Sequence, residues 1–381
     1  MTNGKPVPDY PQTGLAKATS NPHPALTGAT ILPFGADPQE EVRMKKTTFL
    51  GTLAATTVLA GAAFAGTLDD VKARGELLCG SNPGLTGFAA PDANGEYQGF
   101  DAALCKAIAA AVLGDATKVK FVPLSGEVRF TALASGEVDV LIRNSTWTYS
   151  RDTDLKLDFV GVNYYDGQGF MVKKDLGVSS AKELDGATVC IQTGTTTELN
   201  LADFFKQNNI SYTPVTVVDD SEAQRNYLAG TCDAFTTDAS GLAASRSSFP
   251  DPENHIILPE IISKEPLGPA VRHGDNQWGD VVRWTLNALL VAEEKGITKA
   301  NLEEVAASTN DPEVKRLLGL EGDMGKMTGL DNEAFKRAIA ANGNYGEIFE
   351  ANIGSSTPIG LARGLNALWT QGGLQYAAPF R

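Results

Sequence analysis

The chain reads VLIRNSTWTYSRDT over residues 140–153, and this stretch says most about its fold. Residues 140–142 form an apolar run typical of a buried strand, and the hydroxyl-rich residues after it indicate a loop at the carboxyl end of that strand. Ligands of open α/β sheets bind beyond the carboxyl ends of the strands. Arg151, with Ser and Thr donors beside it, suits a small carboxylate ligand there. The stretch therefore predicts an α/β fold with a small-molecule site.

The first 65 residues are expected to lie outside the working protein. Residues 44–65 begin with Met-Lys-Lys, continue as an uncharged run and end in Ala-Phe-Ala, the pattern of a secretory signal peptide. The alternative is a membrane anchor, but the run is short for a span of about 20 apolar residues. Residues 1–43 are proline-rich without apolar periodicity, which predicts a disordered extension that is not native. Export from Met44 predicts a periplasmic location.

The formal net charge of −14 argues against a nucleic-acid partner. No basic stripe is present that could neutralise phosphates. The acidic balance persists when residues 1–65 are left out, and we take it as a solubility feature.

Four cysteines lie beyond the predicted signal: Cys79, Cys105, Cys190 and Cys232. An even number in an exported chain predicts two disulfides, although three connectivities are possible. Four buried thiols are the alternative. The spacing lacks the CxxC pairs of a zinc site, so neither a metal nor another cofactor is expected.

Two segments of the chain repeat one plan. Residues 75–80 and 187–192 are apolar strands that enter polar loops, while residues 133–140 and 228–235 each end a helix at glycine and begin a strand. The repetition predicts two α/β lobes, each a mainly parallel sheet flanked by helices.

The predicted boundaries place lobe 1 at residues 66–165 and lobe 2 at residues 166–265. Residues 266–381 are expected to form a helical C-terminal segment that returns to lobe 1. Helical periodicity marks three parts of this segment, namely residues 280–295, 302–318 and 332–339.

An α-amino acid needs a guanidinium and N–H or O–H donors for its carboxylate and an acid for its ammonium. Arg151 and Thr146 could supply the first, helped by free N–H groups where residues 195–197 begin a helix with Glu198 in a capping box. Asp238, at the end of a lobe 2 strand, could supply the acid. The alternatives are a surface ion pair of Arg151, a turn that only caps its helix, and an N-cap role for Asp238.

Several of these segments together carry a family resemblance. They include Gly99-Phe100-Asp101, Arg129 to Leu133, Asn144 to Arg151, Gly194 to Glu198, Thr237-Asp238, residues 259–272 and the closing residues 364–376. The chain resembles the type II periplasmic solute-binding proteins of polar amino-acid ABC importers. It is most similar to their long subgroup, which binds general L-amino acids, or glutamate, glutamine, aspartate and asparagine.

The resemblance implies a set of ligand contacts. Arg151 and Thr146 would bind the α-carboxylate opposite Thr196, Asp238 would bind the ammonium, and Phe88 would lie against the aliphatic part. Arg129 falls where glutamate and aspartate binders use an arginine for the ligand side chain; its alternative is a helix-surface residue. Gly126 matches a contact position without a side chain, which would leave a roomier pocket. The full predicted set is Phe88, Arg129, Asn144, Thr146, Arg151, Thr195, Thr196 and Asp238.

The resemblance also implies a function and partners. A non-catalytic receptor would capture an L-amino acid between two closing lobes and deliver it to an ABC permease in the inner membrane. By lobe, the disulfides are expected to join Cys79 with Cys105 and Cys190 with Cys232.

Two other classes of function remain as alternatives. An enzyme on this fold, such as a dehydratase or a cell-wall lyase, could use Asp220 as its acid or base, but no GxSxG or HExxH pattern is present. A sensory domain would need a membrane helix after the lobes, and the C-terminal region has no such run.

Overall fold

The computed structural model describes residues 66–381. The predicted extension of residues 1–43 and the predicted signal peptide of residues 44–65 lie outside this range. None of the helices in the described part of the chain has the length and hydrophobicity that a membrane-spanning segment needs.

The first sheet has the strand order β4-β1-β5-β14-β6. β4, β1 and β5 pair in parallel, whereas β14 runs antiparallel to both β5 and β6. Every strand except β14 therefore runs the same way. The bounds are β1 Leu77–Ser81, β4 Val119–Pro123, β5 Val140–Leu141, β6 Leu157–Phe159 and β14 Ala270–Arg272.

The second sheet repeats this plan with the order β10-β9-β11-β8-β12. β10, β9 and β11 are parallel, and β8 is the antiparallel strand between β11 and β12. The equivalence of β1 with β9 and of β5 with β11 confirms the repetition that the sequence predicted. The bounds are β8 Gln168–Lys173, β9 Ala187–Gln192, β10 Tyr212–Val217, β11 Ala234–Asp238 and β12 His255–Ile257.

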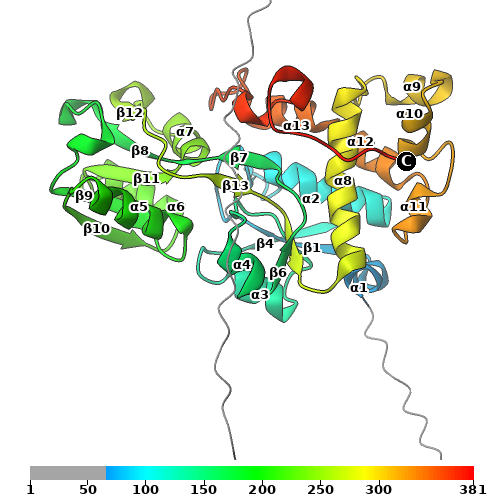
Figure 1. Cartoon of the computed structure of the whole chain (residues 1–381), viewed down its shortest axis with the longest axis horizontal. Helices are drawn as coiled ribbons and strands as arrows, with labels where there is room; N and C mark the ends of the chain where they lie inside the picture. Colours follow the sequence, from blue (N-terminus) through cyan, green and yellow to red (C-terminus); the bar gives the residue numbers. More distant parts are fainter. Residues whose placement is uncertain (1–65) are drawn as a thin grey trace, which may run out of the picture. The chain divides into compact units, whose positions relative to one another are not determined.

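The chain crosses between the two sheets through a pair of short strands. β7 (Tyr164–Asp166) precedes the second sheet, β13 (Glu265–Leu267) follows it, and the two pair antiparallel. Figure 1 shows this pair beside the ribbons of both sheets. The antiparallel strand of each sheet, β8 or β14, is the strand that the chain forms directly after a crossing.

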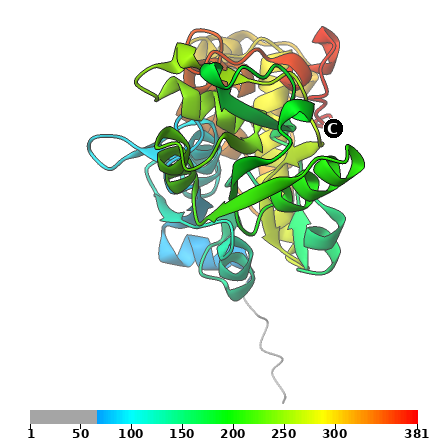
Figure 2. The same cartoon turned by 90° about the vertical axis from the view of Figure 1, so that its left-hand side faces the viewer.

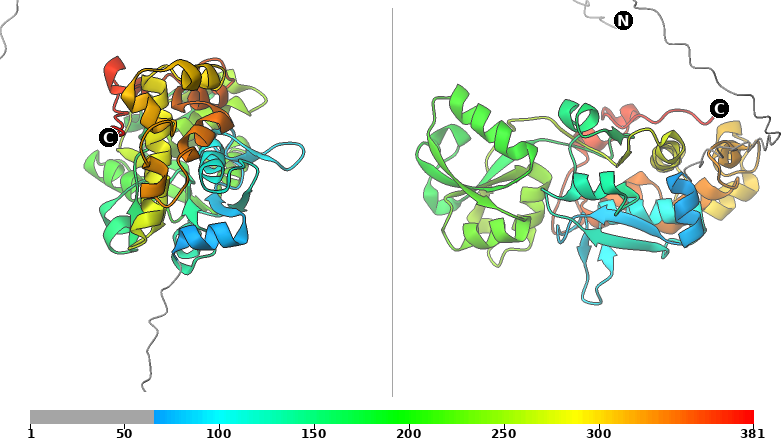
Figure 3. Two further views of the ribbon diagram at one scale, coloured as in Figure 1. Left: turned by 90° about the vertical axis from the view of Figure 1, so that its right-hand side faces the viewer. Right: turned by 90° about the horizontal axis from the view of Figure 1, so that it is seen from below.

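Helices flank both sheets, as the fold class requires. The first sheet carries α1 Thr67–Arg74, α2 Phe100–Leu113, α3 Arg129–Ser135 and α4 Tyr149–Thr153, and the second carries α5 Thr196–Gln207, α6 Asp220–Leu228 and α7 Ala239–Ser247. A hairpin of β2 (Ala90–Pro91) and β3 (Tyr97–Gln98) projects from the first lobe, as the cyan loop in Figures 2 and 3 shows.

The C-terminal segment is mostly helical and packs on the first lobe. Its bounds are α8 Asn276–Glu294, α9 Leu302–Ser308, α10 Pro312–Leu317, α11 Met324–Met327, α12 Ala334–Asn342 and α13 Tyr345–Asn352. The helix predicted over residues 302–318 is divided into α9 and α10, because Pro312 cannot continue a helix from the preceding turn. α12 packs against α2 and α8, which Figure 3 shows as orange beside cyan and yellow.

Short 3₁₀ turns complete the chain. They are η1 Lys174–Leu176, η2 Ala181–Glu183, η3 Pro252–Asn254, η4 Gly364–Asn366 and η5 Trp369–Gln371.

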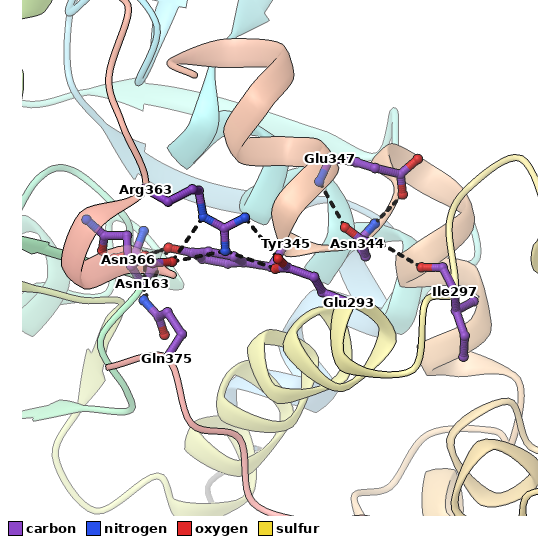
Figure 4. Close-up of polar contacts among 9 residues, drawn as sticks. All are labelled: Asn163, Glu293, Ile297, Asn344, Tyr345, Glu347, Arg363, Asn366 and Gln375. Atoms are coloured by element: carbon purple, nitrogen blue, oxygen red, sulfur yellow. Dashed lines mark hydrogen bonds and ion pairs between the residues drawn. The ribbon is translucent and has the colours of Figure 1, made fainter. Parts of the chain in front are cut away.

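A buried network ties the C-terminal segment to the first crossing (Figure 4). The Tyr345 hydroxyl donates to the carbonyl of Asn163 at 2.8 Å. The Asn366 side chain accepts the N–H of Tyr165 at 2.7 Å and donates to its carbonyl at 3.0 Å. Arg363 pairs with Glu293 at 2.9 Å and donates to the Asn366 carbonyl. The backbone at the start of β7 is therefore fixed by residues far along the chain.

Two disulfides are present, and each lies within one lobe. Cys79 in β1 is joined to Cys105 in α2, and Cys190 in β9 is joined to Cys232, just before β11. These are the expected pairs.

Candidate functional site

A polar cavity lies at the carboxyl ends of the parallel strands of both sheets, where α/β proteins bind their ligands. The first lobe contributes the residues that follow β1 and β5 and the start of α3, and the second contributes those that follow β9 and β11 and the start of α6. The lining residues are Asn82, Leu85, Arg129, Arg143, Asn144, Thr146, Gln192, Thr195, Thr196, Thr197, Asp220, Thr237, Asp238, Ser240 and Gly241.

A left-handed turn aims the loop after β5 at this cavity. The strand ends at Leu141, and Asn144 has a φ of 45°. Asn and Asp tolerate this backbone conformation better than other non-glycine residues. Buried Asp101 fixes the turn by accepting the N–H of Asn144 at 3.1 Å and the amide of Asn163 at 2.9 Å. Its burial raises the pKa of Asp101 to about 6.

Three buried arginines belong to the first-lobe side of the site. Arg129, Arg143 and Arg151 are 2%, 3% and 7% exposed. Burial is the main cause that lowers the pKa of each guanidinium, and for Arg151 it lowers the pKa to about 10. Arg129 and Arg151 both lie over the ring of Phe130, at 4.7 and 4.8 Å from its centroid. Such stacking offsets part of the cost of burying a guanidinium.

Arg151 and Arg143 are used differently. Arg151 Nη1 donates to the Thr146 carbonyl at 2.9 Å, and its side chain does not line the cavity. Arg143 does line it, and its Nη2 is buried without a hydrogen-bond partner. Arg143, which was not among the predicted ligand contacts, therefore presents an unused donor to the cavity.

The start of α5 forms the second-lobe side of the site. The predicted capping box is not formed: Thr195, the N-cap residue, makes no side-chain cap, because its hydroxyl donates to the Gln192 carbonyl at 2.7 Å. Glu198 instead accepts the N–H of Gly194 at 2.9 Å. Thr195 therefore does not act as the side-chain cap that the alternative interpretation of this turn assumed.

Glu265 in β13 occupies the threonine hydroxyls that the sequence assigned to the ligand. Its Oε2 accepts from Thr146 of the first lobe and, at 2.9 Å, from Thr196 of the second. Its Oε1 accepts from Asn200 at 2.7 Å and Ser263 at 2.6 Å. A hydroxyl donates a single proton, so either threonine must turn away from Glu265 before it can donate to a ligand.

Asp238 ends β11 at the second-lobe wall. It holds the N-cap position of α7 but makes no side-chain cap, so the alternative role that the sequence allowed is absent. Loss of water contact raises its pKa well above the ordinary range, and the neighbouring carboxylates of Asp166, Glu265 and Asp220 raise it further. This concentration of negative charge favours a cation, such as a ligand ammonium.

Phe88, like Arg151, is a predicted contact that does not line the cavity, and Gly126 acts differently from what the resemblance implied. Phe88 is fully buried among aromatic rings, 5.6 Å from Tyr164 and 6.2 Å from Phe100 between centroids, and Leu85 lines the cavity instead. Gly126 does not line it either. A Cβ on Gly126 would come 2.8 Å from the Thr193 carbonyl, so the glycine permits close approach to the second lobe rather than a roomier pocket.

The two lobes contact each other around the cavity. The Asn82 amide donates to Asp220 at 3.1 Å, and the Thr193 hydroxyl donates to Glu127 at 2.7 Å. Arg129 Nη2 lies 3.4 Å from the Gly194 carbonyl. Among residues 66–381 no group of His, Cys, Asp or Glu is arranged to hold a metal ion.

Six of the eight predicted contacts thus line one cavity, and their roles toward a ligand stay predictions. They are Arg129, Asn144, Thr146, Thr195, Thr196 and Asp238. The predicted contacts did not include Asn82 after β1, Gln192 at the end of β9, or Asp220 after β10, which was considered only as the acid or base of an enzyme. Each is a polar residue at the carboxyl end of a parallel strand, and that position was the signal that could have identified them.

Comparisons with known proteins agree with this architecture. The family model described as bacterial extracellular solute-binding proteins, family 3, matches residues 77–304. The chain is 75% identical over 338 residues to the glutamate/glutamine/aspartate/asparagine-binding protein BztA of Rhodobacter capsulatus, covering 89% of this chain and 100% of that protein. It is 59% identical to the general L-amino acid-binding periplasmic protein AapJ of Rhizobium johnstonii, covering 86% of this chain and 96% of the relative.

A solved structure is similar across both lobes. A periplasmic binding protein of an ABC transporter from Brucella ovis, with glutathione bound, has 58% identity and a TM-score of 0.81, covering 83% of this chain and all of that one. The family match covers more than half of the sequence, and the relatives are matched over nearly their whole length. The chain therefore belongs to the bacterial extracellular solute-binding proteins, family 3.

Proposed function

We propose that this protein is the periplasmic substrate-binding component of an ABC importer for polar L-amino acids. Glutamate, glutamine, aspartate and asparagine are the foremost substrates, as in the name of the relative BztA. It binds without catalysis and delivers the ligand to a permease in the inner membrane.

One observation carries the proposal: the cavity has cationic groups on one lobe and an anionic group on the other. Buried Arg129 and Arg143 line the first-lobe side, and Asp238 lines the second-lobe side. An α-amino acid carries the complementary pair of charges on a single carbon. A ligand that contacts both lobes stabilises the closed arrangement by its differential affinity for it.

A second candidate ligand is glutathione, which the Brucella ovis relative holds. Its glutamyl end has the same α-carboxylate and ammonium, so the groups that suit glutamate would also suit glutathione. Both arginines that line the cavity, Arg129 and Arg143, are available to the carboxylate and carbonyl oxygens of this longer ligand.

The test is a thermal-shift screen of the purified protein with the twenty L-amino acids and glutathione. A ligand that binds only the folded state raises the midpoint of unfolding as its concentration rises. We expect upward shifts for glutamate, glutamine, aspartate and asparagine. Silence of all twenty-one compounds would reject the proposal. NMR of each ligand after incubation with the protein shows whether it is chemically changed. An unchanged ligand indicates a receptor, and a converted one indicates an enzyme that uses Asp220.

A further inference from the structure

Arg143 is the most conspicuous unused group in the cavity. Its Nε donates to the Leu124 carbonyl at 3.0 Å, and this is the one hydrogen bond of its side chain within residues 66–381. Its Nη2 is buried with no partner. Leaving a buried charged donor unpaired is costly, so an oxygen atom of a ligand placed here would recover that free energy.

Asp220 faces the same cavity from the other lobe. It begins α6, and its Oδ2 accepts from the Asn82 amide. Its carboxylate is the strongest opposing influence on the burial-lowered pKa of Arg143, which shows that the two charges sense each other. The described side chains of Arg143 and Asp220 nevertheless form no ion pair, so a ligand group can lie between donor and acceptor.

The two residues together discriminate between an amide and an acid. An amide offers a carbonyl oxygen as acceptor and an N–H as donor, whereas a carboxylate offers only acceptors. A side-chain carboxylate could meet Arg143 but would be repelled by Asp220. An amide satisfies both residues and joins one lobe to the other.

We propose that Arg143 and Asp220 recognise the side-chain amide of the ligand, Arg143 donating to the amide oxygen and Asp220 accepting from the amide N–H. The inference rests on the proposed function and narrows its substrate class to amino acids with a side-chain amide. The γ-glutamyl linkage of glutathione is the same chemical group, so glutamine and glutathione are two sources of one chemistry. Acidic ligands bind through the arginines, but Asp220 repels their side-chain carboxylate.

The decisive experiment compares glutamine, glutamate and glutathione by isothermal titration of wild type and Asp220→Asn. Removing the negative charge of Asp220 removes its repulsion of the glutamate side chain. It also makes residue 220 a weaker acceptor for the amide N–H of glutamine. We expect the preference for glutamine over glutamate to fall by about tenfold or more, the usual worth of a charged hydrogen bond. An unchanged preference overturns the inference.

The matched control is Asp219→Asn, one residue earlier. Asp219 is the N-cap of α6 and does not line the cavity. Asn is an equally good N-cap, so this variant removes the same charge and keeps the helix. Asp219 acts on Arg143 through its charge alone and less strongly than Asp220, so we expect the glutamine preference to change much less than in Asp220→Asn. An equal change in both variants would overturn a specific role for Asp220.

Arg143→Met tests the other partner while retaining much of the side-chain volume. Glutamine and glutamate should each bind about tenfold more weakly or worse, since both lose an oxygen partner. Thermal unfolding without ligand checks that the variant is folded, and Asp220→Asn tests the inference independently if it is not. Unchanged affinities in a folded Arg143→Met protein would overturn the assignment of Arg143.

The outcomes separate the two proposals and the two ligand sources. If wild type binds none of the three compounds or the other acidic and amide amino acids, the proposed function and this inference are both wrong. If wild type binds but Asp220→Asn keeps its preference, only this inference is wrong. If Asp220→Asn binds both glutamine and glutathione more weakly, Arg143 and Asp220 recognise the amide of both ligands. If only the affinity for glutamine falls, they recognise the free amino acid.

Discussion

The pKa of Asp238, which lines the cavity, is subject to opposing influences from its neighbours. Its carboxylate is held away from water beside Asp166, Glu265 and Asp220, all of which raise its pKa, while Arg129 lowers it. Burial also raises the pKa of Asp166, to about 6. An ammonium group placed among these acids would relieve their mutual repulsion and draw Asp238 into its ionised form.

Affinity for an amino acid should consequently depend on pH. Because the raised pKa favours the protonated form of Asp238 in the free protein and a bound ammonium favours the ionised form, binding releases protons. Affinity should fall as the pH drops below the free-state pKa, by up to about tenfold per pH unit. Titrations between pH 8 and pH 5, in buffers of different ionisation enthalpy, measure both effects. If the affinity of wild type did not depend on pH and equalled that of Asp238→Asn, the assignment of Asp238 to the ligand ammonium would be contradicted.

Arg151→Ala should weaken every amino-acid ligand alike. The α-carboxylate is common to all of them. Arg151 does not line the cavity here, so its guanidinium has to move to reach this group, and a charge-assisted hydrogen bond formed there contributes roughly 1.5–3 kcal/mol. Arg151 also holds the Thr146 carbonyl, so its loss should loosen the loop after β5. The measurement is the ratio of mutant to wild-type dissociation constants for glutamate, glutamine and asparagine. A loss confined to one side chain would place Arg151 in the side-chain pocket instead.

At the scale of elements, short loops after parallel strands set the geometry of the cavity. The loop before α3 reaches the turn after β9, where Gly126 lies against Thr193 and Glu127 accepts the Thr193 hydroxyl. The absence of a side chain at Gly126 permits this approach, because the Cβ of any other residue would meet a backbone oxygen.

Gly126→Ala should therefore impair lobe closure more than folding. The added Cβ would lie 2.8 Å from the Thr193 carbonyl, and overpacking of this kind costs about 1–3 kcal/mol. We expect roughly tenfold weaker binding with little change in the free energy of unfolding without ligand. Gly84→Ala is the control, since nothing lies within 4 Å of its added Cβ. Equal affinities for the two variants would show that the contact does not limit closure.

The sequence predicted the strands and helices that local patterns encode, and missed those that distant contacts create. β1, β9 and their loops follow from apolar runs that enter polar turns. Strand β14 has only three residues and exists because it pairs with β5 and β6. Helix α13 lies in the segment that was predicted to be helical, and its capping box of Asn344 and Glu347 marks its start.

The same distinction holds for the site. Thr146, Thr196 and Asp238 were predicted to lie together because they follow equivalent strands of two repeated lobes. Arg143 was not, because its position depends on where β5 ends and on the left-handed turn at Asn144. Glu265 was missed because its partners come from both lobes and meet only in the folded chain.

At the scale of the whole molecule, each lobe is stabilised separately while the crossings connect them. Both disulfides lie within a lobe, and neither joins residues that line the cavity. The C-terminal segment braces the backbone next to β7 through Tyr345 and Asn366. The disulfides therefore do not hold the two lobes together. Noncovalent contacts and the ligand determine how closely the lobes approach each other.

Replacing Cys190 and Cys232 by alanine should separate stability from binding. Closing a loop of 42 residues restricts the unfolded chain, so its loss should lower the free energy of unfolding by about 2–4 kcal/mol. Urea unfolding measures this loss. Affinity for glutamine should stay within about twofold, since additivity holds for sites without shared partners. A large loss of affinity in the folded double variant would show that the disulfide also shapes the site.

Isothermal titration of the purified protein with glutamate, glutamine, aspartate and asparagine tests the central claim most directly. The account predicts saturable binding of at least one of them with one ligand per chain. Binding should weaken in Asp238→Asn, which alters the second-lobe wall, and in Arg151→Ala, which loosens the first-lobe loop that holds Thr146. Absence of binding heat and of competition for all four amino acids, in a protein shown to be folded, would contradict it.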